Sequence, residues 1–216
     1  MSLIYLASEI HFVAKEIFVD ISKFKKSFRT AFIITGSEEI KDTGWVVDNR
    51  RGMVDAGFDL FDYTISGKTP DDLETDLKNV DIIHVNGGDP TKICKEARQS
   101  GFDKFIKRKL DQGFIYTGSS AGSFVTALYI SKIYTDKKEK LGLGISPVFI
   151  IPHWGRKDRI NQNLKQRLPL IIEEDSLKLI MLNDNQYLKI LDGKIEFMDV
   201  REGREKGERW EVDSEL

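Results

Sequence analysis

The stretch FIYTGSSAGSFV, residues 114–125, decides how the rest of the chain can be interpreted. A β-branched and aromatic run leads directly into Gly-x-Ser-x-Gly, and apolar residues able to form a helix follow. Strand, tight turn and helix in this order are the setting in which Gly-x-Ser-x-Gly forms a nucleophile elbow. We therefore predict that Ser120 is a nucleophile in a strained turn, where Gly118 and Gly122 let neighbouring backbones approach closely. The alternative is a Ser/Gly loop that only caps a helix.

Composition limits the class of protein. The chain has 216 residues, of which 40% are hydrophobic and 31% charged, as in globular proteins with a core of their own. A net charge of −2 gives no field that would attract nucleic acid or an anionic membrane. The single cysteine, Cys94, fits a reducing compartment. There is no signal-peptide pattern, and no apolar run approaches the roughly 20 residues that span a bilayer. We expect one domain over residues 1–216, cytoplasmic, monomeric or homodimeric, without nucleic-acid or membrane partners.

Short apolar runs alternate with segments of helical spacing in the first half of the chain. The runs predict strands at 3–7, 30–35, 58–63, 81–85 and immediately before the elbow. The intervening segments predict helices at 13–24, 45–56, 70–80 and 91–112, the last with a break allowed at Gly101. This alternation is typical of an α/β fold, a mostly parallel sheet with helices on both faces. Ligands bind such sheets at the carboxyl ends of the strands, where both Gly87-Gly88 and Ser120 fall.

The second half carries weaker patterns. Strands are expected at 148–151 and 177–182, a helix at 161–170 and a solvated loop at 134–140. Asp192 and Gly193 separate two short apolar runs, 187–191 and 194–198, which predicts a two-residue hairpin. The charged tail from Arg201 onward is expected to be loosely held.

A nucleophilic serine needs a base within hydrogen-bond reach, and the chain offers three histidines. His11 begins the first predicted helix, where a cap or surface role is the ordinary one. His84 lies inside an apolar strand, which is typical of a buried histidine satisfied by a hydrogen bond. His153 follows the strand 148–151 and is therefore expected on the same rim of the sheet as Ser120. We predict that His153 is the base.

The acid that orients the imidazole has two candidates. Asp184 follows the predicted strand 177–182 and so reaches the same rim, which favours it. Asp136 lies between the elbow and His153 in sequence, inside a lysine-rich loop.

The oxyanion formed by attack on an acyl group needs two donors directed at one point. The N–H of Ala121 supplies one by its position after the nucleophile, and Gly88 is the best candidate for the other. Gly87 and Gly88 can equally be a tight turn into a helix capped by Asp89, and the two roles are compatible.

Four short motifs occur in one order along the chain, NGGDP at 86–90, GSSAGS at 118–123, PHW at 152–154 and NDN at 183–185. Together they resemble the dipeptidase E and cyanophycinase family of serine peptidases. The resemblance implies a fold similar to class I glutamine amidotransferases, with a serine where those carry cysteine at the elbow. It implies Ser120 as nucleophile, His153 as base, and Gly88 with Ala121 as oxyanion hole. The family's acid has been placed either just before the histidine or near the C-terminal strands, so both aspartates stay open.

One departure from the family concerns the substrate. Members that cut after an N-terminal aspartate usually read Gly-Gly-Asn-Thr, where this chain has Gly88, Asp89 and Pro90. Asp89 beside the substrate would repel an aspartyl side chain by on the order of 1 kcal/mol. Arg156 and Arg159 could bind a carboxylate, or they could face solvent.

The combined prediction is a serine peptidase acting on dipeptides or other small amides, with small peptides as its partners. No cofactor is expected, and no metal, because the histidines have no paired ligand spacing. The alternatives are a serine hydrolase of esters or other amides, and a relative without catalysis that binds a metabolite.

Overall fold

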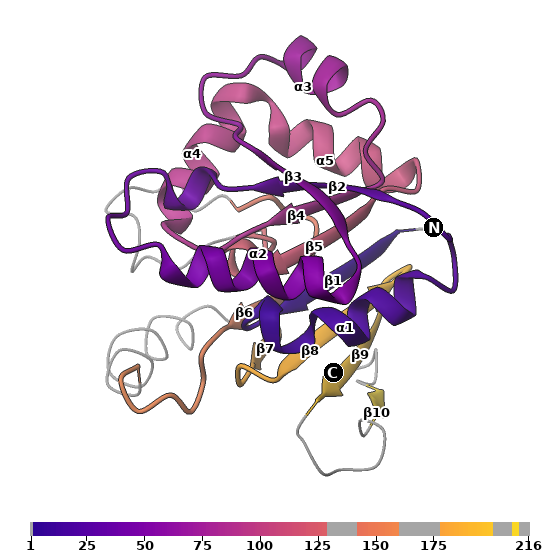
Figure 1. Cartoon of the computed structure of the whole chain (residues 1–216), viewed down its shortest axis with the longest axis vertical. Helices are drawn as coiled ribbons and strands as arrows, with labels where there is room; N and C mark the ends of the chain where they lie inside the picture. Colours follow the sequence, from indigo (N-terminus) through magenta and orange to yellow (C-terminus); the bar gives the residue numbers. More distant parts are fainter. Residues whose placement is uncertain (1, 129–141, 160–177, 201–208, 212–216) are drawn as a thin grey trace.

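The structure, a computed structural model, describes residues 2–128, 142–159, 178–200 and 209–211 (Figure 1). Its main sheet has the strand order β10-β9-β8-β1-β5-β4-β2-β3. The strands are β1 (Leu3–Ala7), β2 (Arg29–Ile33), β3 (Asp59–Tyr63), β4 (Ile82–Val85), β5 (Ile115–Ser119), β8 (Gln186–Leu191), β9 (Lys194–Asp199) and β10 (Arg209–Glu211). The strands β1 to β5 are mutually parallel, and β8, β9 and β10 extend the sheet by antiparallel pairing.

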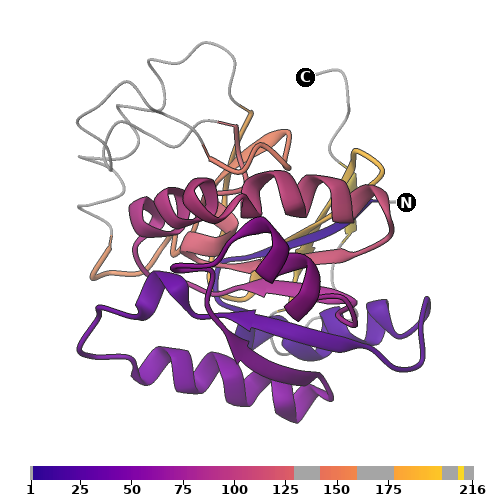
Figure 2. The ribbon, with the colours of Figure 1, turned by 90° about the horizontal axis from the view of Figure 1, so that it is seen from above.

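Helices cover both faces of this sheet, as predicted (Figure 2). One face carries α1 (Ile10–Ile21) and α2 (Gly44–Ala56), and the other carries α3 (Pro70–Asp76), α4 (Pro90–Ser100) and α5 (Phe102–Asp111). Successive strand residues point to opposite faces. In β1, Leu3 and Tyr5 pack in the core beneath α1, while Ile4 and Leu6 pack in the core that contains α4 and α5. Both faces of β1 are therefore buried, which is why its sequence is a continuous apolar run.

The helix boundaries follow local signals. The predicted helix at 91–112 is divided at Gly101, whose φ of 78° is left-handed. The helix expected at 70–80 begins at Pro70 with a capping box between Thr69 and Asp72, but it ends at Asp76. In the described part of the chain, no helix is long and apolar enough to cross a membrane.

The expectation that His153 follows a strand of the main sheet is wrong, although His153 does reach Ser120. The strand before it, β6 (Val148–Ile151), pairs in parallel with β7 (Lys178–Met181) in a separate two-stranded sheet. The place beside β1 is taken by β8 instead. The small sheet packs on α6 (Ala121–Phe124), where the rings of Phe124 and Phe149 meet edge-on with centroids 4.7 Å apart.

In the C-terminal part, the structure agrees with the predicted hairpin and differs from the prediction for the tail. The hairpin at Asp192 and Gly193 is confirmed, with both residues at positive φ (48° and 84°). The tail is more ordered than expected at 209–211, because β10 pairs with β9. The predicted loop at 134–140, which contains Asp136, and the predicted helix at 161–170 lie outside the described residues.

Candidate active site

Three neighbouring parallel strands bring the site together. The strands β1, β5 and β4 lie side by side, so the segments that leave their carboxyl ends meet at one edge of the sheet (Figure 1). These segments are Ser8-Glu9 after β1, Ser120 after β5, and Gly87-Gly88 after β4. The antiparallel strand β8 starts at the same edge, since Tyr187 pairs with Ala7. It therefore brings Asp184, two residues before its start, to this edge as well.

The turn at Ser120 is strained in the way the elbow motif predicts. Ser120 has φ 52° and ψ −113°, a backbone conformation that residues other than glycine rarely adopt. Its N–H donates to the carbonyl oxygens of Ala7 (3.2 Å) and Ser8 (3.0 Å), which fix the turn onto the end of β1. A Cβ at Gly122 would lie 1.9 Å from the carbonyl oxygen of Val85, so a larger residue there would separate the elbow from β4.

Ser120, His153 and Asp184 form a continuous hydrogen-bonded chain. The Ser120 Oγ lies 2.8 Å from His153 Nε2, and His153 Nδ1 lies 2.7 Å from Asp184 Oδ1. His153 is 9% exposed and has a positive φ of 58°, which turns its ring back from the small sheet toward the elbow. The geometry brings together the predicted nucleophile and base with Asp184 as the orienting acid.

Ser8 makes hydrogen bonds to both His153 and Asp184. Its hydroxyl donates to Asp184 Oδ1 (2.9 Å) and accepts from the N–H of His153 (2.7 Å). Burial alone would raise the pKa of Asp184, but the hydrogen bond and charge of His153 and the Ser8 hydroxyl lower it below the ordinary carboxyl value. Asp184 is therefore an ionised carboxylate, the form that stabilises an imidazolium.

The predicted oxyanion donors border the same space. Gly88 and Ala121 line a cavity with Ser120, and no acceptor among the described residues binds either N–H. Gly88 has φ 125°, and a Cβ there would lie 2.1 Å from the carbonyl oxygen of Gly36. The loop thus requires glycine at this position in order to present its backbone to the cavity.

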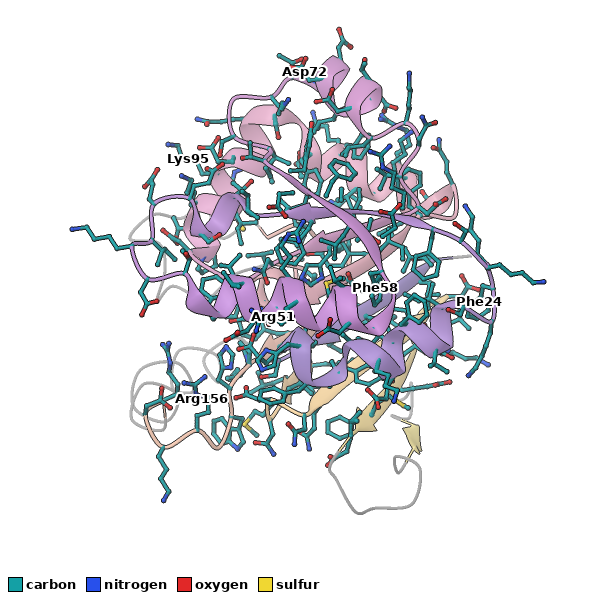
Figure 3. The ribbon with its side chains drawn as sticks, in the orientation of Figure 1. Phe24, Arg51, Phe58, Asp72, Lys95 and Arg156 are labelled. Carbon is teal, nitrogen blue, oxygen red and sulfur yellow. The ribbon has the colours of Figure 1, made fainter. Side chains whose placement is uncertain are left out.

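The cavity has a volume of about 390 Å³. Apolar residues from separate parts of the chain form much of its wall, namely Ile40, Trp45, Pro90, Phe124 and Pro152. Arg156 and Arg159 also line it. Arg156, labelled at the lower left of Figure 3, forms hydrogen bonds of 3.0 and 2.9 Å with Asp158. Asp89, predicted to border the substrate, does not line this cavity. Its carboxylate accepts from the N–H of Thr91 (2.8 Å) and caps α4.

The other two histidines have structural surroundings. His84 is fully buried, its Nδ1 lies 2.9 Å from Thr117 Oγ1, and its ring stacks on Phe32. Burial lowers the pKa of His84 to about 3, so this imidazole is neutral. His11 Nδ1 lies 2.9 Å from the side-chain oxygen of Asn49. Neither histidine lines the cavity.

Sequence reasoning missed Ser8 and Glu9. Glu9 is 7% exposed and lines the cavity beside Ser120 and His153. Both residues follow directly on β1, so the rule that placed Gly88 at a strand end applies to them equally. To apply that rule to Ser8 and Glu9, one must know that β1 lies beside β5, and the sequence pattern alone does not show this pairing.

Comparisons with known proteins agree with this geometry. A model described as peptidase family S51 matches residues 6–198. An uncharacterized peptidase of Listeria monocytogenes is 27% identical over 115 residues, which are 53% of this chain and only 56% of that protein. An uncharacterized peptidase of Listeria innocua is 24% identical over 174 residues, 76% of this chain and 81% of that protein. A crystal structure of a candidate peptidase E protein from Listeria monocytogenes EGD-e matches with a TM-score of 0.76 at 18% identity, covering 93% of this chain and 100% of that chain. The fold that the motifs implied is confirmed.

Proposed function

The chain belongs to peptidase family S51, a family of serine peptidases, and on that premise we propose that it hydrolyses dipeptides or other small amides through an acyl-enzyme on Ser120. The observation that carries the proposal is the hydrogen-bonded chain from Ser120 Oγ through His153 to Asp184, with contacts of 2.8 and 2.7 Å. A serine hydroxyl is a weak nucleophile on its own, and this arrangement supplies the base that activates it.

The proposed mechanism has two halves. In the first, Ser120 Oγ attacks the amide carbonyl while His153 Nε2 accepts the hydroxyl proton, and the negative oxygen is bound by the N–H groups of Gly88 and Ala121. His153 then gives the proton to the leaving amine as the C–N bond breaks. In the second half, water loses a proton to His153 and attacks the acyl-enzyme, which releases the acid and restores Ser120. Asp184 stays ionised throughout and holds the imidazole in position.

The size and charge of the cavity support a small substrate. A volume of about 390 Å³ is near the lower end of ligand pockets, which hold molecules the size of a dipeptide. Arg156 and Arg159 in its wall are suited to a substrate carboxylate, because guanidinium groups bind carboxylates in a fixed geometry. We further propose that the enzyme is cytoplasmic and works as a monomer or homodimer without a cofactor.

The test is a dipeptide-library assay on the purified protein, its Ser120→Ala and His153→Ala variants and the double variant. Each single variant should lose most hydrolysis, and the double variant should be scarcely worse, because the two residues act as a unit. A fluorophosphonate reagent should label Ser120, as mass spectrometry of the digested protein would detect. EDTA should leave the activity unchanged. Hydrolysis that persists in Ser120→Ala, or that chelation removes, would contradict the proposal.

A further inference from the structure

Glu9 is a buried acid in the wall of the active-site cavity that no structural role explains. It occupies the N-cap position of α1, yet its side chain makes no capping hydrogen bond. Its Oε1 atom is buried and has no hydrogen-bond partner in the part of the chain that the structure describes. Its side chain is only 10% exposed, and Glu9 is one of the residues that line the cavity that holds Ser120.

The neighbours of Glu9 do not neutralise it. Its carboxylate oxygens lie 3.8 Å from His11 Nδ1 and 3.9 Å from His153 Nδ1, and no described lysine or arginine forms an ion pair with it. Burial raises the pKa of Glu9, and the charge of His153 and the Asn49 amide offset that effect only in part. Buried carboxyl groups in proteins are otherwise paired or hydrogen-bonded, because their desolvation is unfavourable. Among the described residues, Glu9 thus lacks the cation that normally accompanies a buried carboxylate.

The position of Glu9 suits an ammonium group on the substrate. His153 contacts both residues. Its Nδ1 atom lies 3.9 Å from the Glu9 carboxylate, and its Nε2 atom lies 2.8 Å from Ser120 Oγ. In a peptide, the amine of the first residue is two bonds from the carbonyl carbon that is attacked. Glu9 and Ser120 line the same cavity, so an amine that binds Glu9 there would direct the adjoining carbonyl into the space beside Ser120.

We propose that Glu9 binds the free α-amino group of the substrate, so that the enzyme cleaves after the N-terminal residue. The inference rests on the proposed function, since it identifies which end of a small peptide the site recognises. With Glu9 for the amine and the two arginines for a carboxylate, the cavity wall matches a zwitterion.

The experiment compares two forms of one dipeptide, with a free and with an N-acetylated amine, on the wild type and on Glu9→Gln. A third form with hydrogen in place of the amine covers the case in which the acetyl group does not fit. We expect Glu9→Gln to lower kcat/KM for the free amine by about 10- to 100-fold, the worth of one charged hydrogen bond. The blocked and deaminated forms should change by less than about twofold, because they never make that contact. Glu16→Gln, on the same helix α1, is the matched control and should leave all three unchanged.

The possible failures are distinguishable. If the wild type hydrolyses none of the three forms, the proposed function itself is wrong. If the wild type uses all three equally, or if Glu9→Gln lowers all three by the same factor, Glu9 acts through His153 or through folding and the inference is overturned. Calorimetric binding of the free dipeptide to Ser120→Ala, with and without Glu9→Gln, gives a readout independent of turnover. Binding should weaken by the same factor as kcat/KM, and unchanged binding would also overturn the inference.

Discussion

A buried acid, Glu9, directly precedes helix α1, and a partly buried acid, Asp20, lies near the C-terminal end of that helix. Their surroundings shift the two pKa values in opposite directions. Near the C-terminal end, Asp20 accepts hydrogen bonds from Tyr5 (2.7 Å) and Lys23 (3.0 Å) and pairs with the buried ammonium of Lys189 at 2.5 Å. Burial opposes its charge, but the bonds from Lys189, Tyr5 and Lys23 lower the pKa of Asp20 to about 2. At the N-terminal end, no lysine or arginine in the described part of the chain pairs with Glu9, and burial raises its pKa.

The helix dipole would predict the reverse. It stabilises an acid at the N-terminus and destabilises one at the C-terminus, by about 0.3–1 kcal/mol in each case. The observed directions are opposite at both ends, so direct partners and burial outweigh the dipole here. Asp20 has its counter-charge in Lys189, whereas Glu9, which we propose binds the substrate amine, pairs with no lysine or arginine among the described residues. The predictions below test this difference, from the largest expected change in free energy to the smallest.

Removing the cation at the Asp20 end should have the largest effect. We expect Lys189→Met to lower the free energy of unfolding by about 3 kcal/mol, because it leaves the partly buried Asp20 without its main partner. Lys23→Met is the matched control on the same carboxylate. The Lys23 side chain is 67% exposed, against 8% for Lys189, so its loss should cost at most about 1 kcal/mol. Urea unfolding measures both. Equal losses would show that the buried pair does not account for the difference between the two ends.

The second prediction concerns Asp184, the acid that contacts His153 in the active site. We expect Asp184→Asn to lower kcat by on the order of a hundredfold or more with folding intact, because the amide no longer stabilises the imidazolium. Asp136→Asn should cost about tenfold at most, since the carboxylate that accepts the hydrogen bond of His153 Nδ1 is that of Asp184. Steady-state kinetics and circular dichroism on both variants decide the matter. The opposite ranking would make Asp136 the acid.

A smaller effect is expected at Ser8, which connects Asp184 to the backbone of His153. Ser8→Ala removes both hydrogen bonds and should lower kcat by about tenfold, which corresponds to about 1.4 kcal/mol. The control is Ser22→Ala at the far end of α1, where the hydroxyl donates only to the carbonyl of Phe18. Its kcat should equal that of the wild type. Equal kcat in Ser8→Ala and wild type would mean that Asp184 holds His153 unaided.

The smallest effect concerns the stability of the Glu9 end. Because the folded-state pKa of Glu9 is raised, the folded protein binds more protons than the unfolded chain between the two pKa values. The contribution of Glu9 to stability is thus lost as the pH rises from the ordinary carboxyl pKa through the raised one. We expect Glu9→Gln to raise Tm near pH 7 and to lose this advantage below about pH 4, where the carboxyl is neutral in both states. A Tm that falls equally at both pH values would show that Glu9 stabilises the fold.

Local patterns explain most of what the sequence predicted correctly. Buried strands appeared as continuous apolar runs, and the glycines at 118 and 122 indicated the close approach that the structure shows. Asp184 was favoured because it follows a strand, and the contact of 2.7 Å to His153 agrees. What failed was strand pairing. The run at 148–151 is apolar like any central strand, and nothing local says that its partner is β7 in a separate sheet. Glu9 was missed for the same reason, since its importance depends on β1 lying beside β5.

The division of the catalytic pair between two sheets has a consequence for biosynthesis. Ser120 leaves the main sheet, whereas His153 arrives on the small sheet and Asp184 follows that sheet's second strand. Protein chains emerge from the ribosome N-terminus first, and the earlier part begins to fold before the later part exists. A growing chain that has reached only the elbow therefore carries a serine without a base. On the proposed mechanism, the enzyme becomes reactive only after His153 and Asp184 have been synthesised and have come to lie beside Ser120.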